Sequence, residues 1–208
     1  WYRKEWGMSE LAQHWDDLFA RTDACALGWY ESDPSQTLKW LEEVPAGGRT
    51  FVAGAGTTGL VEALLARGDA LVVNDISAMA LAQVRDRLAV DAAVEWVCQD
   101  VAKPLPENLV PVDLWVDRAV LHFLHHEEEI LGYFANLRCL VRPGGHVLLA
   151  EFSSAGALKC AGLEVHRYSL EEMCRRMDGF EMIGHEEYLF HNPKGDPRPY
   201  LYCLFRRL

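Results

Sequence analysis

A short apolar strand runs directly into a glycine-rich turn and a helical pattern near residue 50, and few folds accommodate that order. Residues 51–68 are FVAGAGTTGLVEALLARG, so Gly54, Gly56 and Gly59 follow a strand predicted at 49–53. Glycines let the backbone turn sharply and approach a ligand closely, and the helix N-terminus behind them favours negative charge. A strand, a tight glycine turn and a helix are typical of the first unit of an α/β sheet.

The rest of the chain continues this alternation. Strands are predicted at 49–53, 70–75, 94–101, 112–120 and 146–152, and helices at 58–66, 77–88, 127–141 and 169–177. Two last strands, 180–190 and 199–207, flank the polar loop HNPKGDPR and are predicted to pair antiparallel. Alternating strands and helices form a parallel sheet that is covered on both faces. The predicted fold class is therefore α/β, a Rossmann-like, doubly wound sheet of seven strands, mostly parallel, with the last strand antiparallel.

The N-terminal residues precede this alternation and are predicted to be helical. They are rich in aromatic side chains, among them Trp15, Trp29 and Tyr30. The chain is thus divided into a helical lid or cap segment at 1–45 and an α/β domain at 46–208, which together form a single domain. Met8 is a second candidate for the native start, with residues 1–7 as an added leader, and the sequence favours neither start.

Composition restricts the partners that this chain can take. The formal net charge is −11 over 208 residues, and no basic stripe that could follow a phosphate backbone is present, so nucleic acid is not expected. No apolar run approaches the roughly 20 residues of a membrane span. The six cysteines lack metal-knuckle spacing and are expected to be reduced, mostly buried thiols. We therefore expect a cytoplasmic protein, monomeric or weakly homodimeric, without metal.

The glycine turn alone does not select its ligand. Backbone amides at a helix N-terminus serve a dinucleotide pyrophosphate, and they serve the carboxylate of an amino-acid tail equally well. Asp75 ends the second strand, 21 residues after Gly54, where a carboxylate can accept both hydroxyls of a ribose. The turn and the carboxylate together indicate an adenosyl ligand. The alternative is that the glycines form a turn in an unrelated sheet and bind no ligand.

Four further features narrow the choice. The chain begins with aromatic helices rather than with the first strand. Asp100 ends the third strand in VCQDV, where a carboxylate can meet an adenine amino group. The segment VDLWVDRAVLHFL leaves the fourth strand with Asp117 and Arg118 at its C-terminal tip, the edge at which such sheets bind ligands. LRCLVRPGGHVLLAEF then predicts a helix, a Pro-Gly-Gly turn and a fifth strand before the final hairpin.

Together these features resemble the class I S-adenosylmethionine-dependent methyltransferases over about residues 49–208. Five segments are similar to a small bacterial-type group near the thiopurine and tellurite-resistance branch: HWDDLF, GWYESDPSQTL, DRAVLHFL, CAGLEVHRYS and YLYCLFRR. The resemblance implies S-adenosyl-L-methionine as cofactor, S-adenosyl-L-homocysteine as product, and a methyltransferase domain at 46–208. Two positions depart from the usual pattern, because Val52 replaces an acid that many class I enzymes carry and Thr58 replaces a glycine.

The resemblance also implies the residues of the site. Cofactor contacts are expected from Trp15, Trp29, Gly54, Ala55, Gly56, Thr57, Gly59, Asp75, Ile76, Ser77, Asp100, Val101 and Asp117. Catalytic roles are expected for His122, Asp117 and Arg118, and substrate contacts for Tyr30, His122, Phe123, Arg167 and Tyr168. His122 is the expected general base because a histidine pKa lies near neutrality. The structural alternatives are a scaffold role for His122, a buried Asp117–Arg118 ion pair, and tryptophans that only pin helices.

The function predicted from these residues is methyl transfer from S-adenosylmethionine to a small-molecule acceptor: a thiol, another chalcogen species or an amine. Two alternatives remain, a protein lysine methyltransferase and a non-catalytic S-adenosylmethionine-binding protein. A metal site at His122, His125 and His126 is not expected, because residues 125–129 are better explained as the polar first turn of a helix.

Overall fold

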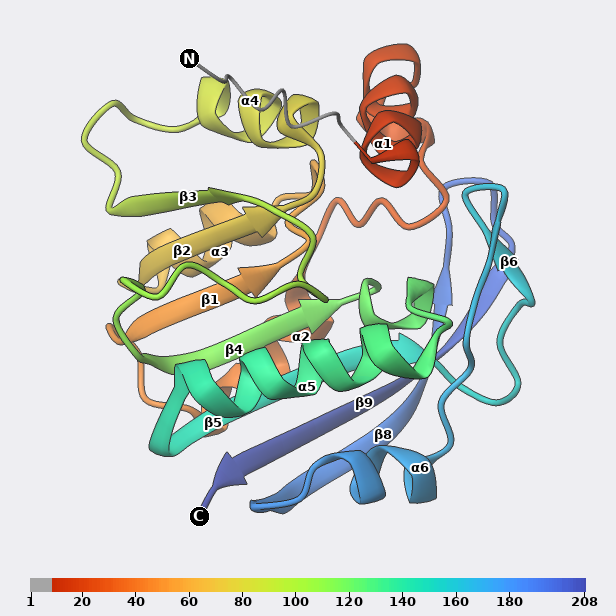
Figure 1. The fold of residues 1–208 in the computed structure, drawn as a ribbon. Helices are drawn as coiled ribbons and strands as arrows, with labels where there is room; N and C mark the ends of the chain where they lie inside the picture. Colours follow the sequence, from red (N-terminus) through yellow and green to blue (C-terminus); the bar gives the residue numbers. More distant parts are fainter. Residues whose placement is uncertain (1–8) are drawn as a thin grey trace, which may run out of the picture.

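The computed structural model describes residues 9–208, and its seven-stranded sheet confirms the predicted fold class (Figure 1). The strands are β1 (Arg49–Ala53), β2 (Ala70–Asp75), β3 (Val94–Cys98), β4 (Val112–Arg118), β5 (Val141–Phe152), β8 (Phe180–His191) and β9 (Pro197–Arg207). Their order is β3-β2-β1-β4-β5-β9-β8, and β9 runs antiparallel to both of its neighbours. The alternative start at Met8 lies outside the described residues.

Helices cover both faces of the sheet because alternate strand residues point to opposite sides. Phe51 and Trp115 pack with α5 (Glu127–Leu140) and α6 (Leu170–Arg176) on one face. Val52 and Val116 pack with α3 (Leu60–Ala66) and α4 (Ala78–Arg87) on the other. Both faces of the central strands are therefore buried, which explains their continuous apolar sequences.

Local signals set several element boundaries as predicted. The Ser77 hydroxyl accepts from the Ala80 amide at the start of α4, and Ser169 accepts from Glu172 at the start of α6. The third strand ends earlier than predicted, at Cys98, because the chain turns at Asp100. The fifth strand begins earlier, at Val141, because that residue already pairs with β4 before a register shift.

The N-terminal segment contains α1 (Glu10–Arg21), the 3-10 turn η1 (Ala24–Ala26), α2 (Ser35–Trp40) and the 3-10 turn η2 (Leu41–Glu43). Its first half lies over the carboxyl ends of the central strands, and α2 and η2 pack on the sheet face that α3 and α4 cover. Figure 1 shows α1 beside α4, and Asp16 connects them by accepting hydrogen bonds from the Ser77 hydroxyl at 2.5 Å and the Met79 amide at 3.0 Å. Buried Trp15 and Phe19 pack on Ala80 of α4.

A short hairpin that the sequence did not predict contacts the same segment. Its strands are β6 (Lys159–Cys160) and β7 (Leu163–Glu164), and Ala161 and Leu163 pack against the cluster formed by Trp15 and Phe19.

The cysteines are less buried than the sequence analysis predicted. All six are free, but four are exposed because they lie outside the two packed cores: Cys25, Cys98, Cys139 and Cys174. Among residues 9–208, no helix is both long and apolar enough to cross a bilayer.

Candidate functional site

A large pocket lies at the carboxyl ends of the parallel strands, under the N-terminal segment. Its empty space, including the open mouth, is about 880 Å³. Its wall combines the glycine turn after β1, the ends of β2 and β3, the turn after β4 and aromatic side chains of residues 15–29. It brings together eleven of the sequence-predicted site residues: Trp15, Trp29, Gly54, Ala55, Gly56, Asp75, Ile76, Asp100, Val101, Arg118 and Phe123.

The glycine turn has a backbone that other residues do not readily adopt. Gly54 and Gly56 have φ angles of +53° and +54°, in the left-handed region. A Cβ on Gly54 would lie 2.1 Å from Cγ2 of Val120, so the turns after β1 and β4 approach each other too closely for a side chain. The glycines therefore permit close contact between two segments of the pocket wall.

Asp75 links the glycine turn to the start of α4. Its Oδ2 accepts from the Gly56 amide and its Oδ1 from the Ser77 amide, both at 2.9 Å. Burial raises the pKa of this carboxyl to about 6, although the two backbone hydrogen bonds oppose the shift. A carboxylate has about four acceptor positions, so Asp75 retains acceptor capacity toward the pocket, where a ribose diol would use it.

An aromatic cluster forms the pocket wall opposite the strands. The ring centroids of Trp15 and Trp29 are 5.6 Å apart and those of Trp15 and Phe123 are 4.9 Å apart, in edge-to-face arrangements. Phe19 extends the cluster. Aromatic faces attract cations, and more strongly where water is excluded.

Arg118 connects the end of β4 to the N-terminal segment rather than to Asp117. Its Nε lies 3.0 Å from Oε2 of Glu31, with both side chains buried, and it donates to the Trp29 carbonyl at 3.0 Å. Its guanidinium also lies over the rings of Phe190 and Tyr200, at 5.0 and 5.2 Å from their centroids. The Asp117–Arg118 ion pair considered from the sequence is therefore replaced by a long-range pair with Glu31.

His122 and Asp117 are not brought to the pocket. The His122 ring is fully buried, stacks on Phe152 with centroids 4.6 Å apart, and has Nδ1 2.7 Å from Oε2 of Glu151. Burial lowers the pKa of His122 to about 3, which disfavours proton uptake. The general-base expectation for His122 does not fit this geometry and is corrected here. Both residues lie in a 3-10 turn at Leu121–Phe123, in which Phe123 lines the pocket and its neighbour His122 is buried.

Asp117 lies fully buried behind the same turn. Its carboxylate accepts from the Val120 amide at 3.0 Å, the Leu121 amide at 3.2 Å and the Tyr133 hydroxyl at 2.7 Å. These contacts make Asp117 a support of the pocket wall, which differs from its expected direct contact with cofactor and substrate.

The remaining predicted residues surround the pocket without lining it. Thr57 is buried, Gly59 lies at the N-cap of α3, and Ser77 caps α4. Tyr30 packs beside the Trp15 cluster. Arg167 lines a second, smaller cavity that includes His125, Ser154 and His166.

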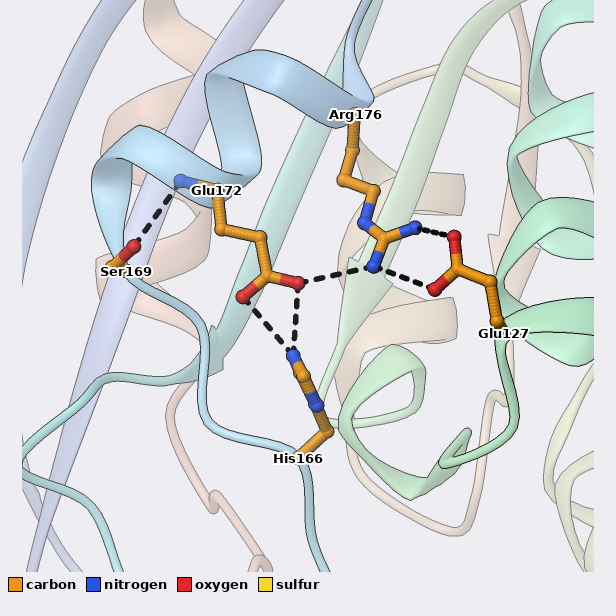
Figure 2. A network of polar contacts seen from close by, with 5 residues as sticks. All are labelled: Glu127, His166, Ser169, Glu172 and Arg176. Carbon is orange, nitrogen blue, oxygen red and sulfur yellow. Dashed lines mark hydrogen bonds and ion pairs between the residues drawn. The ribbon is translucent and has the colours of Figure 1, made fainter.

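Figure 2 shows the polar network that fixes the loop carrying Arg167 and Tyr168. Nε2 of His166 lies 3.0 Å from Glu172, whose amide donates to the Ser169 hydroxyl. Arg176 bridges Glu172 at 3.2 Å and Glu127 at 2.9 Å. The network joins the start of α5 to α6, and Tyr168 is buried beside it.

Two residues that the sequence reasoning missed shape the site. Glu31 is the buried partner of Arg118, and Glu151 contacts the His122 ring. The acid of LLAEF was a usable signal for Glu151, since a charge inside an apolar strand needs an explanation. Within residues 9–208 there is also no group of three or more His, Cys, Asp or Glu side chains that could hold a metal ion.

Comparisons with known proteins agree with this geometry. Residues 51–147 match a family model described as a methyltransferase domain. No curated protein matches the chain by sequence. Among solved structures, the N-methyltransferase NodS from Bradyrhizobium japonicum WM9, in complex with S-adenosylhomocysteine, is 16% identical with a TM-score of 0.74, covering 96% of this chain and 99% of that one.

Two further solved structures have the same fold. The 1,6-didemethyltoxoflavin-N1-methyltransferase from Burkholderia thailandensis, with bound 1,6-didemethyltoxoflavin and S-adenosylhomocysteine, is 19% identical with a TM-score of 0.68, covering 94% and 83% of the two chains. TehB from Haemophilus influenzae is 13% identical with a TM-score of 0.65, covering 84% and 62%.

The donor set of the pocket fits the cofactor that this family uses. A carboxylate at the end of β2, backbone amides in the glycine turn and an aromatic wall suit a ribose, an amino-acid tail and a sulfonium respectively. Residues 51–147 thus match a methyltransferase domain, and the order of strands is that of the class I, Rossmann-like methyltransferase fold.

Proposed function

We propose that this enzyme methylates a small molecule at a thiol, another chalcogen or an amine, without a general base from the protein. The observation that carries the proposal is the set of ionisable side chains that residues 9–208 place on the pocket wall: Asp75, Asp100 and Arg118. Arg118 is paired with Glu31. Asp75 and Asp100 stand at the ends of β2 and β3, the adenosine end in our assignment.

An acceptor in this pocket must therefore be nucleophilic when it arrives. Thiols ionise near pH 8.5, so a useful fraction is thiolate at mildly alkaline pH. Alcohols remain protonated in that range and need a base at the reacting oxygen. The aromatic wall formed by Trp15, Trp29 and Phe123 favours an apolar or flat acceptor, and stabilises positive charge nearby.

The roles of the wall follow from its donors and acceptors. Asp75 accepts from the ribose hydroxyls, Asp100 and Val101 face the adenine, and the turn at Gly54–Gly56 holds the amino-acid tail. When bound, S-adenosylmethionine supplies an electrophilic methyl group on sulfur. The protein aligns the acceptor with that methyl group and excludes water. The part of the predicted lid at 1–45 that lines the pocket, from Leu11 to Trp29, acts as its cover, and the contacts of Trp15 and Trp29 with the pocket support this role.

The relatives support a small acceptor. The toxoflavin enzyme from Burkholderia thailandensis carries its small heteroaromatic molecule beside S-adenosylhomocysteine. Protein lysine methylation has no counterpart among the relatives described above.

The test uses matched acceptors that differ in one atom. Thiophenol and phenol are offered at equal concentration with methyl-labelled S-adenosylmethionine at pH 8, beside aniline and a lysine-rich peptide. We expect methylation of thiophenol, or of the amine, at a rate at least about a hundredfold above that of phenol, the lower range for base catalysis. Equal rates for thiophenol and phenol would contradict the proposal, as would labelling of the peptide alone. Tight cofactor binding with no turnover on any acceptor would favour the non-catalytic alternative.

A further inference from the structure

Two acidic side chains meet in the interior behind the pocket. Asp117 and Glu151 are the penultimate residues of the adjacent strands β4 and β5, and both are 0% exposed. Asp117 accepts from the Val120 and Leu121 amides and Glu151 accepts from the next amide, that of His122, so the two acids lie side by side. Two adjacent buried carboxyl groups cannot both carry charge at low cost, so one of them keeps a proton. Burial raises the pKa of both groups, that of Glu151 to about 8, so the pair keeps a proton at neutral pH.

The pair holds the turn after β4 through three consecutive backbone amides. Asp117 accepts from Val120 and Leu121, and Glu151 accepts from His122 at 3.1 Å. The turn needs such support because Ala119 has a φ of +70°. This left-handed conformation is unfavourable for any residue other than glycine. Removing the pair would leave three amides without their acceptors in a buried place.

The same turn forms part of the pocket wall. Ala119, Val120 and Phe123 line the pocket, and Val120 packs directly against Gly54 of the glycine turn. A displacement of Val120 therefore changes both the surface that faces the ligand and the contact with the cofactor loop.

Every packed element contributes a group near the pair. Tyr133 of α5 donates to Asp117 at 2.7 Å and accepts from Trp115 at 2.9 Å. The His122 ring stays neutral because burial lowers its pKa. Tyr168 precedes α6 and stays protonated because burial and Glu151 raise its pKa. Arg118 is paired with Glu31. Among the described residues, no cation is therefore paired with these acids.

We propose that Asp117 and Glu151 form a proton-sharing acid pair that positions the turn after β4 and thereby sets the shape of the pocket. Both are positioning residues, since neither lines the pocket. Ionisation of Glu151 at alkaline pH would place a charge in the interior beside Asp117 and displace the turn. Cofactor affinity should then fall as pH rises through about 8, the pKa of Glu151.

The first test compares Glu151→Gln with Glu151→Leu. The amide of Gln can donate to Asp117 and accept from the His122 amide, but it has no proton to lose at alkaline pH. Leu can do neither. S-adenosylmethionine affinity is measured by calorimetry from pH 6 to 9.5. The amino group of the cofactor also titrates in this range, and comparison with the Gln variant removes its contribution.

We expect the Gln variant to bind within about threefold of the wild type at pH 7 and to lack the alkaline loss, which should reach about tenfold in the wild type by pH 9.5. The Leu variant should bind at least about tenfold more weakly at pH 7, because it leaves buried groups without partners. The proposal is overturned if the Gln variant shows the wild-type alkaline loss, or if it binds as weakly as the Leu variant at pH 7.

A second test needs no ligand, so it separates this proposal from the acceptor assignment. A carboxyl whose folded pKa is raised contributes stability that is present below its unfolded pKa and is lost as pH rises through the folded pKa. The difference in Tm between the cofactor-free Gln variant and the cofactor-free wild type should therefore shift by at least about 4 °C in favour of the variant between pH 5 and pH 8. A Tm difference that is constant over this range contradicts a shared proton.

Discussion

Arg118 and Glu31 form a buried ion pair that fastens the N-terminal segment to the tip of β4. The atoms Nε and Oε2 are 3.0 Å apart, and the two side chains are only 5% and 7% exposed. The pair spans 87 residues of sequence, and Arg118 also holds the Trp29 carbonyl. The covering of the pocket thus depends on an interaction between two elements that are remote along the chain.

Glu31→Gln should destabilise the protein by about 3 kcal/mol, because it leaves the Arg118 guanidinium charged and without its acid in the interior. The measurement is urea unfolding of the wild type and the variant. Glu43→Gln, at an exposed acid of the same segment, is the matched control. If both variants unfold at the same urea concentration, the Arg118–Glu31 pair does not hold the segment.

Asp75→Ala should weaken S-adenosylmethionine binding at least about tenfold, because two ribose hydroxyls lose a charged acceptor and hydrogen bonds to charged groups contribute about 1.5–3 kcal/mol. Calorimetry measures the dissociation constant, with Asp91→Ala at an exposed site as the control. An unchanged dissociation constant in the Asp75 variant would mean that the ribose is held elsewhere.

His122→Gln tests the corrected role of this histidine. Its folded pKa of about 3 is below the ordinary value of 6.5, so the stability it contributes is present above pH 6.5 and is lost as pH falls toward 3. The variant lacks a titrating ring and should lose less stability than the wild type over this window, as followed by thermal unfolding. The acidic limb of turnover against pH should coincide in the two proteins. A limb that disappears in the variant would restore His122 as the base.

The sequence predicted the features that short segments encode. The glycine turn at Gly54 and Gly56, the caps at Ser77 and Ser169, and the position of Asp75 all depend on neighbouring residues, and the structure has each of them. The antiparallel pairing of the last two strands followed from the polar loop HNPKGDPR between them.

The unpredicted features depend on distant contacts or on unusual backbone. Glu31 gives no local sign that its partner is Arg118. The left-handed turn at Ala119 could not be predicted, because alanine, unlike glycine, rarely adopts a positive φ and so does not indicate one in a sequence. In the 3-10 turn that follows, Phe123 faces the pocket and His122 contacts Glu151, which the sequence alone did not reveal.

The fate of the labelled methyl group tests the central claim most directly. The protein is incubated with methyl-labelled S-adenosylmethionine and a cell extract, and acid precipitation then separates small molecules from proteins. The account predicts that new label, beyond that of the cofactor, appears in a small molecule that chromatography resolves, and that Asp75→Ala greatly reduces it. Label found only in precipitated protein would contradict a small-molecule acceptor.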